Sequence, residues 1–180
     1  QYIPSLAERA YTATLKALAE EVAEGRMLDA AESMLANLEA LEQIHPEYDN
    51  ILYRKSKLLK AMGRTDEAFA SACAYARRRP GVFSAWSALG DVVDDDHLKA
   101  ACYSRAVLCK TDLMFQVKVR YKLAVTMYNI GEYANSKREF EKLAQIYESK
   151  EWHMPPALKA IREQQWYLNT YEADSNRGFY

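Results

Sequence analysis

Apolar side chains recur every three or four positions through most of the chain, which is the spacing of an amphipathic helix. The first such segment is Tyr11–Glu24, and Gly25 follows it. The second is Asp29–Gln43, and Pro46 stands just after it. Glycine adopts the left-handed conformation that closes a helix, and proline disfavours helix in the residue before it. These marks predict one pair of helices joined by a short turn.

The same pattern predicts three further pairs and one lone helix. The predicted segments are 48–61 with 66–79, 84–93 with 97–109, 113–129 with 133–148, and a single helix over 157–171. Asp29, Thr65 and Asp112 stand where N-terminal caps are expected, because their side chains accept hydrogen bonds from free backbone amides. Only six glycines and five prolines occur in 180 residues, which disfavours a fold with many tight β-turns. The sequence therefore predicts an all-α protein.

The helix pairs recur at a nearly constant spacing. Starts near residues 11, 49, 83 and 117 bring the pairs into register, so the last two steps are each 34 residues. Glycines occupy the same place in three of the pairs, at Gly25, Gly63 and Gly131. A period of 34 residues built as helix–turn–helix is the tetratricopeptide spacing.

Signature residues recur in phase with that period. The first-helix pattern is Trp86-x-x-Leu89-Gly90, and Leu123-Ala124 is its weaker copy. The second-helix pattern is Gly131-x-Tyr133-x-x-Ser136-x-x-x-Phe140, which Gly63, Ala68, Ala72 and Pro80 match in the second pair. On these residues the chain resembles the tetratricopeptide-repeat family over roughly residues 11–148. The resemblance implies a right-handed α-solenoid of about four helix-turn-helix repeats with a C-terminal capping helix.

The domain organisation follows from this resemblance. We expect an N-terminal lead-in over residues 1–10, with Pro4 and Ser5 as a helix start, and a repeat array over 11–148. A capping-helix region over 149–173 and a C-terminal tail over 174–180 complete the chain. The match departs from the family in the first repeat, which lacks the Trp and Gly, and in the third, where three aspartates replace the turn glycine.

The small and aromatic residues of the signature have a packing role in such repeats. Ser56, Gly90 and Ala124 are expected to let the partner helix approach closely. Tyr103 and Phe140 are expected to fill the space between neighbouring pairs. A stack of pairs then shares one core and curves around a concave side.

The resemblance implies that the first helix of each pair lines a concave groove. Three positions spaced four and then three apart share that face of a helix. The groove residues predicted in this way are Tyr53, Lys57 and Lys60 in the second repeat, Ser87, Asp91 and Asp94 in the third, and Tyr121, Val125 and Tyr128 in the fourth. The first repeat supplies Leu15, Ala19 and Val22, which would form an apolar end.

Aromatic and cationic side chains on a rigid concave surface suit an extended or helical peptide. The sequence therefore favours a protein–protein interaction scaffold or adaptor that is not an enzyme and needs no cofactor. The alternative interpretation is ordinary solvated or edge-packed residues. Some family members clamp the C-terminal carboxylate of chaperone tails with lysines and asparagines. The matching first-repeat positions here are Leu15 and Ala19, so that clamp is absent.

A second hypothesis for function is a helical-repeat RNA or DNA binder, or the repeat module of a larger nucleic-acid-handling protein, including a bacterial defence-type protein. Arg77, Arg78 and Arg79 form the basic patch that would contact phosphates. Cations at the end of a helix also complement its dipole, which explains the run without any ligand. The formal net charge is only −1, so no overall field attracts nucleic acid.

The remaining titratable residues have structural interpretations. Asp94, Asp95, Asp96 and His97 form an acidic turn without the alternation or glycine of a calcium loop, so no metal site is predicted. The three cysteines fit no metal or nucleophile pattern. Glu20, Glu21, Glu139 and Glu141 are interpreted as charges on exposed helix faces.

The last helix is expected to pack Ile161, Trp166 and Leu168 over the open end of the array. Alternatively, this helix folds into the groove or contacts another domain. Trp152 and Trp166 leave open pairing of end helices across a homodimer, as well as a monomer. No apolar run reaches the roughly 18 residues that span a bilayer, and an odd number of cysteines argues against a disulfide framework. We therefore expect a cytoplasmic protein without membrane contact.

Overall fold

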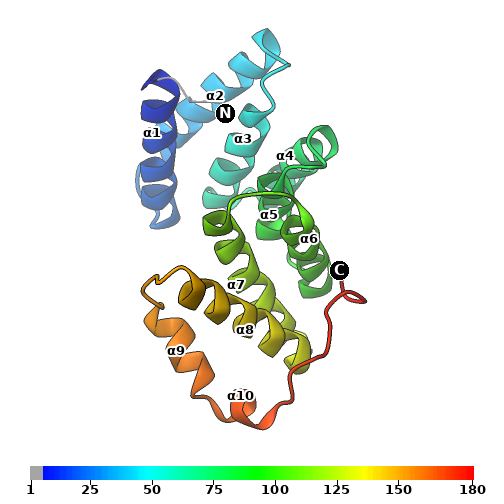
Figure 1. Ribbon diagram of the computed structural model, residues 1–180. Helices are drawn as coiled ribbons and strands as arrows, with labels where there is room; N and C mark the ends of the chain where they lie inside the picture. The colour runs from blue at the N-terminus through cyan, green and yellow to red at the C-terminus, as the bar shows by residue number, and fades with distance from the viewer. Residues whose placement is uncertain (1–5) are drawn as a thin grey trace. The chain divides into compact units, whose positions relative to one another are not determined.

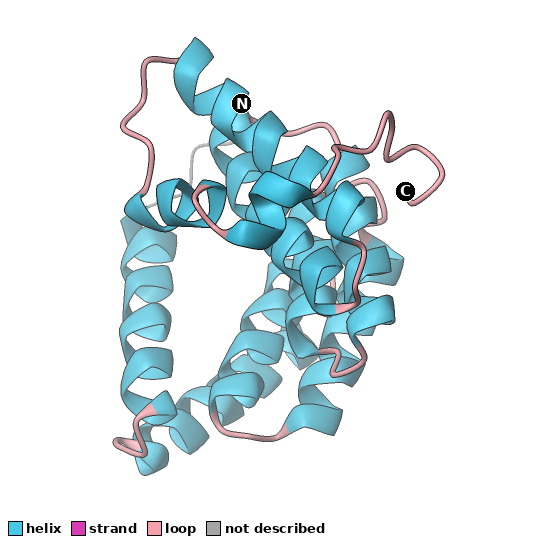
Figure 2. Cartoon of the chain, turned by 90° about the horizontal axis from the view of Figure 1, so that it is seen from below, coloured by secondary structure: helices cyan, strands magenta, loops and turns pink. Residues whose placement is uncertain are grey.

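The computed structural model describes the backbone of residues 6–180 and the side chains of residues 11–180. Every regular element in that span is an α-helix (Figures 1 and 2), so the prediction of an all-α protein is confirmed. The helices are α1 Leu6–Ala23, α2 Leu28–Ile44, α3 Asn50–Ala61, α4 Thr65–Arg78, α5 Phe83–Val92, α6 Asp96–Leu108, α7 Leu113–Asn129, α8 Tyr133–Ser149, α9 Pro156–Arg162 and α10 Gln165–Asn169.

The predicted helix ends agree closely with these bounds, because turn chemistry is local. Gly25, Gly63 and Gly131 have φ angles of 77°, 74° and 84°, the left-handed conformation expected after a first helix. The lead-in is the exception. Residues 6–10 belong to α1 instead of a lead-in, while Pro4 and Ser5 lie outside the described residues.

The predicted helix caps agree less well. Asp29 and Thr65 lie inside their helices, whose N-cap positions are held by Met27 and Arg64. Asp112 is at the N-cap of α7, but its side chain makes no capping hydrogen bond. The side chain of Asp95 does cap, accepting a 2.8 Å hydrogen bond from the backbone N–H of Leu98 at the start of α6.

Helices that are neighbours in sequence pack against each other in two compact units. The first unit extends to Pro80, and the second comprises residues 81–180. In the first unit α1 packs on α2 and α3 on α4, and both α1 and α2 contact α3. In the second unit α5 packs on α6 and α7 on α8, and α6 joins the two pairs through α7. This arrangement of adjacent pairs within each unit is consistent with a helical repeat.

Close approach within a pair depends on a small residue, as predicted. A Cβ atom added to Gly90 in α5 would lie 2.6 Å from the ring of Tyr103 in α6, so only glycine fits there. Tyr103 joins a core between α6 and α7 that includes Val107, Val119 and Leu123. A second core holds Phe140 and Leu143 of α8 together with residues of α7, α9 and α10.

The capping region differs from the single helix expected there. It forms two short helices, α9 and α10, separated at Glu163 and Gln164 (Figure 1). Ile161 and Trp166 pack on the core of α7 and α8 as predicted. Leu168 was predicted wrongly, because it is 61% exposed and Tyr167 is the buried residue instead. A predicted helical face shifts when the helix breaks.

In the part of the chain that the structure describes, no helix combines the length and apolar character needed to cross a bilayer.

Candidate functional site

The predicted strip on α3 lies at the surface of the first unit. Tyr53 is half-buried, and its ring lies 5.7 Å from that of Tyr75 in α4. The Nζ of Lys57 sits 4.9 Å from the centre of the Tyr53 ring, a cation–π contact. Lys60, one turn further along, is exposed. The strip therefore presents an ordered ring with two cations beside it.

The matching residues of the first pair are core residues. Leu15 is 7% exposed and Val22 is 4% exposed, so they do not form the apolar end of a groove. Ala19 lies between them and is half-buried. The repeat register was extrapolated too far here, because the first pair lacks the signature residues that set the helix rotation elsewhere.

The predicted acidic strip is partly engaged inside the second unit. Asp91 accepts hydrogen bonds from the hydroxyl of Tyr103 at 2.7 Å and from the Nζ of Lys122 in α7 at 2.6 and 2.8 Å. Burial raises the pKa of Tyr103, and the neighbouring Asp91 carboxylate raises it further. Ser87 is half-buried and Asp94 is exposed. Asp91 thus joins α5, α6 and α7.

The predicted strip on α7 faces the C-terminal helices. The ring of Tyr121 meets the edge of Phe140 with 5.8 Å between ring centres, and Val125 packs on the same core. Tyr128 is 38% exposed, and its ring lies 4.7 Å from Trp166 of α10 and 5.3 Å from Tyr133 of α8. Trp166, which packs on the core of α7 and α8, therefore also contacts this strip.

Tyr128, Tyr133 and Trp166 form a cluster that we name the aromatic platform. Tyr133 and Trp166 are 6.0 Å apart, so each ring contacts both others. Tyr133 remains 45% exposed. Sequence analysis missed Tyr133 as a surface group because it treated this residue only as a packing position of the repeat. The adjacent aromatic pair Trp166-Tyr167 was the available signal for the third member.

The basic patch is attached to its own unit. Arg78 donates a 2.9 Å hydrogen bond to the carbonyl of Pro46 and lies 3.7 Å from the carboxylate of Asp49. Arg79 lies 3.7 Å from the other oxygen of Asp49, and Arg77 is exposed. Two of the three guanidinium groups are therefore partly neutralised by the loop before α3.

A charged cluster that sequence analysis missed lies between α7, α8 and the chain's last residues. Glu139 was interpreted as an exposed charge, yet it is fully buried. Its carboxylate accepts hydrogen bonds from Arg120 at 2.5 Å, Lys142 at 2.9 Å and Asn176 at 2.7 Å, and from the hydroxyl of Tyr180. A buried carboxylate needs such donors because an unpaired charge away from water is costly.

The donors determine the charge state of Glu139. Burial alone would raise its pKa, but the Tyr180 hydroxyl, Arg120 and Lys142 together outweigh burial and hold the pKa below the ordinary value. The carboxylate is therefore ionised at neutral pH. Glu141 was also predicted to be exposed, but it is half-buried and accepts a 2.6 Å hydrogen bond from the hydroxyl of Tyr167.

Residues 173–180, which we name the C-terminal strap, bring two of the donors. The backbone N–H of Ala173 donates to the carbonyl of Ala134 at 3.2 Å, and the side chain of Asn176 donates to the carbonyl of Asn135 at 3.1 Å. Phe179 and Tyr180 pack against the core of α6 and α7. The strap thus lies on a different set of α8 residues from those that contact α10.

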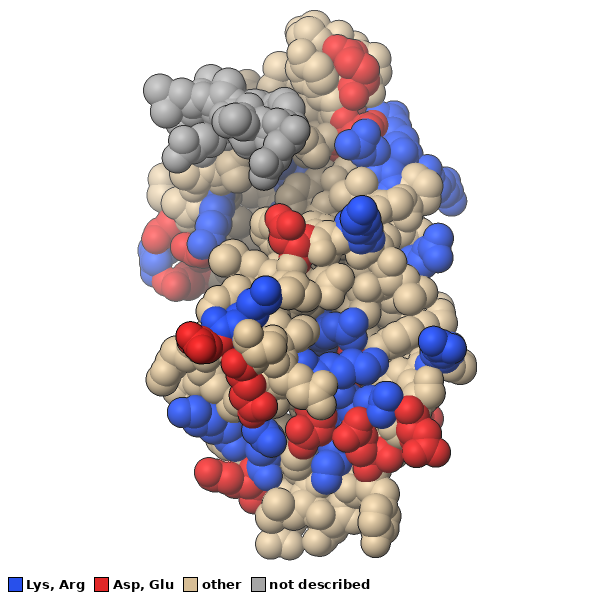
Figure 3. Space-filling view, in the orientation of Figure 1, with Lys and Arg blue, Asp and Glu red and all other residues tan. Residues whose placement is uncertain are grey.

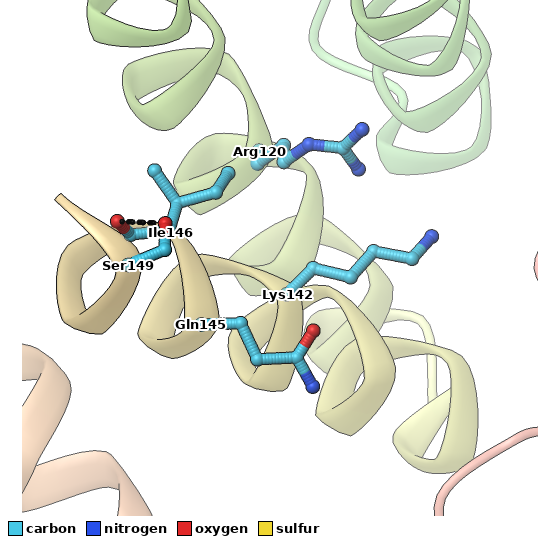
Figure 4. A pocket seen from close by; sticks show the side chains of 5 residues that line it. All are labelled: Arg120, Lys142, Gln145, Ile146 and Ser149. Carbon is cyan, nitrogen blue, oxygen red and sulfur yellow. Dashed lines mark hydrogen bonds between the residues drawn. The ribbon is translucent and has the colours of Figure 1, made fainter.

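A hollow of about 320 Å³ adjoins this charged cluster (Figure 4). Arg120 and Lys142 extend to the same side from α7 and α8, and Gln145, Ile146 and Ser149 complete the lining. The charged ends of both cations are directed to Glu139, so their stems and Ile146 make the hollow largely apolar. Over α7 and α8, blue and red side chains lie next to one another in Figure 3, without a large region of one sign.

Two of the cysteines and the acidic turn have packing, capping or ion-pair contacts. Burial raises the pKa of Cys73 and of Cys109, which makes these thiols poorer nucleophiles at neutral pH. Asp96 pairs with Lys99 at 2.6 Å. Among residues with described side chains, no three His, Cys, Asp or Glu residues gather in a way that would hold a metal ion.

Comparison with known proteins gives one family. The model of a family described as "Domain of unknown function (DUF7017)" matches residues 50–180. No curated protein matches the sequence.

Proposed function

The chain belongs to the DUF7017 family, and we propose that it is a non-enzymatic interaction module that binds a peptide or partner helix of another protein. We further propose that its pairs are tetratricopeptide-like repeats of a right-handed solenoid. The 34-residue register supports this, because Gly63 and Gly131 adopt the same turn. Independently of that register, Ser71 of α4 and Ser136 of α8 each donate a hydrogen bond to a carbonyl of the preceding helix, at 2.8 and 2.7 Å.

The observation that carries the proposal is the aromatic platform. Tyr128, Tyr133 and Trp166 come from three helices and contact one another while Tyr128 and Tyr133 keep 38% and 45% of their surface exposed. Tyrosine and tryptophan dominate the energetics of protein interfaces because they bury large areas at a low entropic cost. A preformed cluster reduces that cost further, since its rings are already ordered.

The α3 strip is a separate candidate binding surface that lies within the first unit. Lys57 is held over Tyr53, and Lys60 is exposed beside it. Charges at the edge of an interface set orientation and association rate more than affinity. A partner segment that reaches this strip would therefore carry acidic side chains.

The proposal assigns no catalysis and no cofactor. Three residues of types that often do such chemistry are engaged elsewhere, with Asp91 in an ion pair, Asp95 in a helix cap and Cys109 in the core. Three free thiols also suit a reducing compartment, and we propose a cytoplasmic location, as a monomer or as a homodimer through the end helices.

Site-specific photo-crosslinking tests the platform. A photoreactive phenylalanine analogue replaces Tyr128 in one variant and Tyr171 in a control variant. Tyr171 is suited to this because it is 92% exposed. We expect protein adducts specific to position 128, identified by mass spectrometry, in cells that express the chain. Replacing Tyr133 with alanine in the same variant should reduce the adduct severalfold.

Two outcomes contradict the proposal. Adducts that are equal at positions 128 and 171 would show that the platform has no partner. Nuclease-sensitive adducts would favour the nucleic-acid hypothesis instead. In that case, binding to a labelled single-stranded RNA should fall steeply with salt and be lost when Arg77, Arg78 and Arg79 are all changed to alanine.

A further inference from the structure

The C-terminal strap is ordered by side-chain contacts instead of regular secondary structure. No helix includes residues 170–180, and the backbone N–H groups of Phe179 and Tyr180 turn back to the carbonyl of Asn176 at 3.0 and 3.1 Å. Ordering each residue costs about 1–2 kcal/mol of backbone conformational entropy. The face under the strap must therefore supply enough binding energy to hold an extended segment.

The first part of that face is apolar. Phe179 and Tyr180 lie on the core between α6 and α7, against buried side chains that include Val107, Val119 and Leu123. Aromatic rings that cover such a surface are stabilised in proportion to the apolar area they bury. This contact favours aromatic side chains but selects little between phenylalanine and tyrosine.

The second part is polar and selective. The hydroxyl of Tyr180 and the side-chain amide of Asn176 both donate to one carboxylate oxygen of Glu139, which has no exposed surface. Arg120 and Lys142 each pair with one of the two oxygens of the same carboxylate. A segment that lacks either the hydroxyl or the amide would cover this carboxylate with one donor fewer, and losing a hydrogen bond to a buried charged group is costly.

We infer that this face of α6, α7 and α8 is a peptide-recognition site, occupied in the structure by the chain's own strap. Its ligand is an extended segment with asparagine three residues before a Phe-Tyr pair, recognised by the phenol hydroxyl and the asparagine amide. The partner is a protein segment of that chemistry supplied in trans. The inference goes beyond the proposed function, because it concerns other residues than the aromatic platform.

Competition from the strap regulates access to the site. A segment tethered by a short linker has an effective concentration in the millimolar range. A trans segment that makes the same contacts is therefore excluded by the strap. It binds only when the strap's contacts are weakened or when the trans segment binds the site more tightly than the strap does. The strap makes the site selective for ligands that reproduce both hydrogen bonds.

A binding experiment with the full chain tests this inference. The probe is a fluorescent peptide of residues 171–180, YEADSNRGFY, amidated at its end so that no terminal carboxylate contributes. It is titrated into the wild-type chain and into a strap variant that carries Asn176→Ala and Tyr180→Ala. We expect the strap variant to bind the peptide at least tenfold more tightly than the wild type, because the internal competitor is weakened.

Two further arms examine the polar contact. A peptide with Tyr180→Phe should bind the strap variant about tenfold more weakly, and Glu139→Gln in that variant should also weaken the unmodified peptide. The peptide change leaves the protein untouched, so it reports on the hydroxyl even if Glu139→Gln impairs folding. If the strap variant kept its helical fold and bound the peptide no more tightly than the wild type, the inference would be overturned. Equal binding of the tyrosine and phenylalanine peptides would do the same.

Discussion

The α3–α4 pair and the α7–α8 pair occupy the same register, two repeat periods apart, yet they use one position in opposite ways. In α4 this position is Ser71, whose hydroxyl donates a hydrogen bond to the carbonyl of Leu52 in α3, the other helix of the same pair. In α8 it is Glu139, whose carboxylate accepts from Asn176 and Tyr180 of the strap. The serine hydroxyl is satisfied within its own helix pair, whereas the buried carboxylate, besides Arg120 and Lys142 of its own pair, also takes two donors from the strap.

The outer strips of the two pairs differ in the same direction. Lys57 and Lys60 of α3 correspond to Val125 and Tyr128 of α7. The lysines keep the α3 strip at the surface, while Val125 and Tyr128 contact the C-terminal helices. The comparison teaches that repeat packing sets the position of a side chain on its helix. The chemistry of that side chain then decides whether it stays in solvent or contacts a further segment of the chain.

The largest effect expected from this comparison is the loss of Arg120. Arg120→Ala removes the closest cation from a fully buried carboxylate and leaves Lys142 as the remaining one, and breaking a buried ion pair costs about 3 kcal/mol. Ser71→Ala removes a neutral hydrogen bond at the matching position and should cost about 1 kcal/mol. Urea unfolding followed by circular dichroism measures both free energies. Similar values for the two variants would mean that the buried charge is not the difference between the pairs.

A smaller effect is expected where α5, α6 and α7 meet. Asp91→Asn weakens the bonds to Lys122 and Tyr103 and should lower the free energy of unfolding by about 1.5 kcal/mol. Asp94→Asn is the matched control, since Asp94 is exposed, and should change it by no more than about 0.5 kcal/mol. The same urea titrations decide the matter. If Asp94→Asn were the more damaging change, the acidic strip would depend on a contact other than the one described.

The smallest and most gradual effect is the pH dependence of the strap. The pKa of Glu139 is lower in the folded protein than in an unfolded chain, so its contribution to stability is complete above the unfolded value, near 4.3. It is lost as the pH falls through the lower folded value, because the protonated acid binds Arg120 and Lys142 less strongly.

Unfolding free energies measured from neutral pH downwards test this dependence. The wild type should lose more stability below about pH 4 than Glu139→Gln, which has no carboxylate to protonate at this position. Parallel curves for the two proteins would place the acid sensitivity elsewhere in the chain.

Some residues of the candidate surfaces could be predicted from the sequence, and others could not. Tyr53, Lys57 and Tyr128 were predicted from the repeat resemblance together with helical spacing, because residues at steps of three and four share one face, and all three are at least partly exposed. Leu15 and Val22 followed the same rule and were assigned wrongly, since spacing identifies a face but does not say what packs on it. Tyr133 and Trp166 completed the aromatic platform only once the C-terminal helices were placed against α7 and α8.

The sequence by itself determined the first eight helices, the glycine turns between them and their spacing, because apolar periodicity, glycine and proline act over one or two turns of chain. Tertiary structure alone decided the fate of Glu139 and the role of the strap. The residues that meet at this carboxylate are as far apart in sequence as Glu139 and Tyr180, 41 positions. No local rule brings them together, because their contact depends on how α9 and α10 turn the chain back along α8.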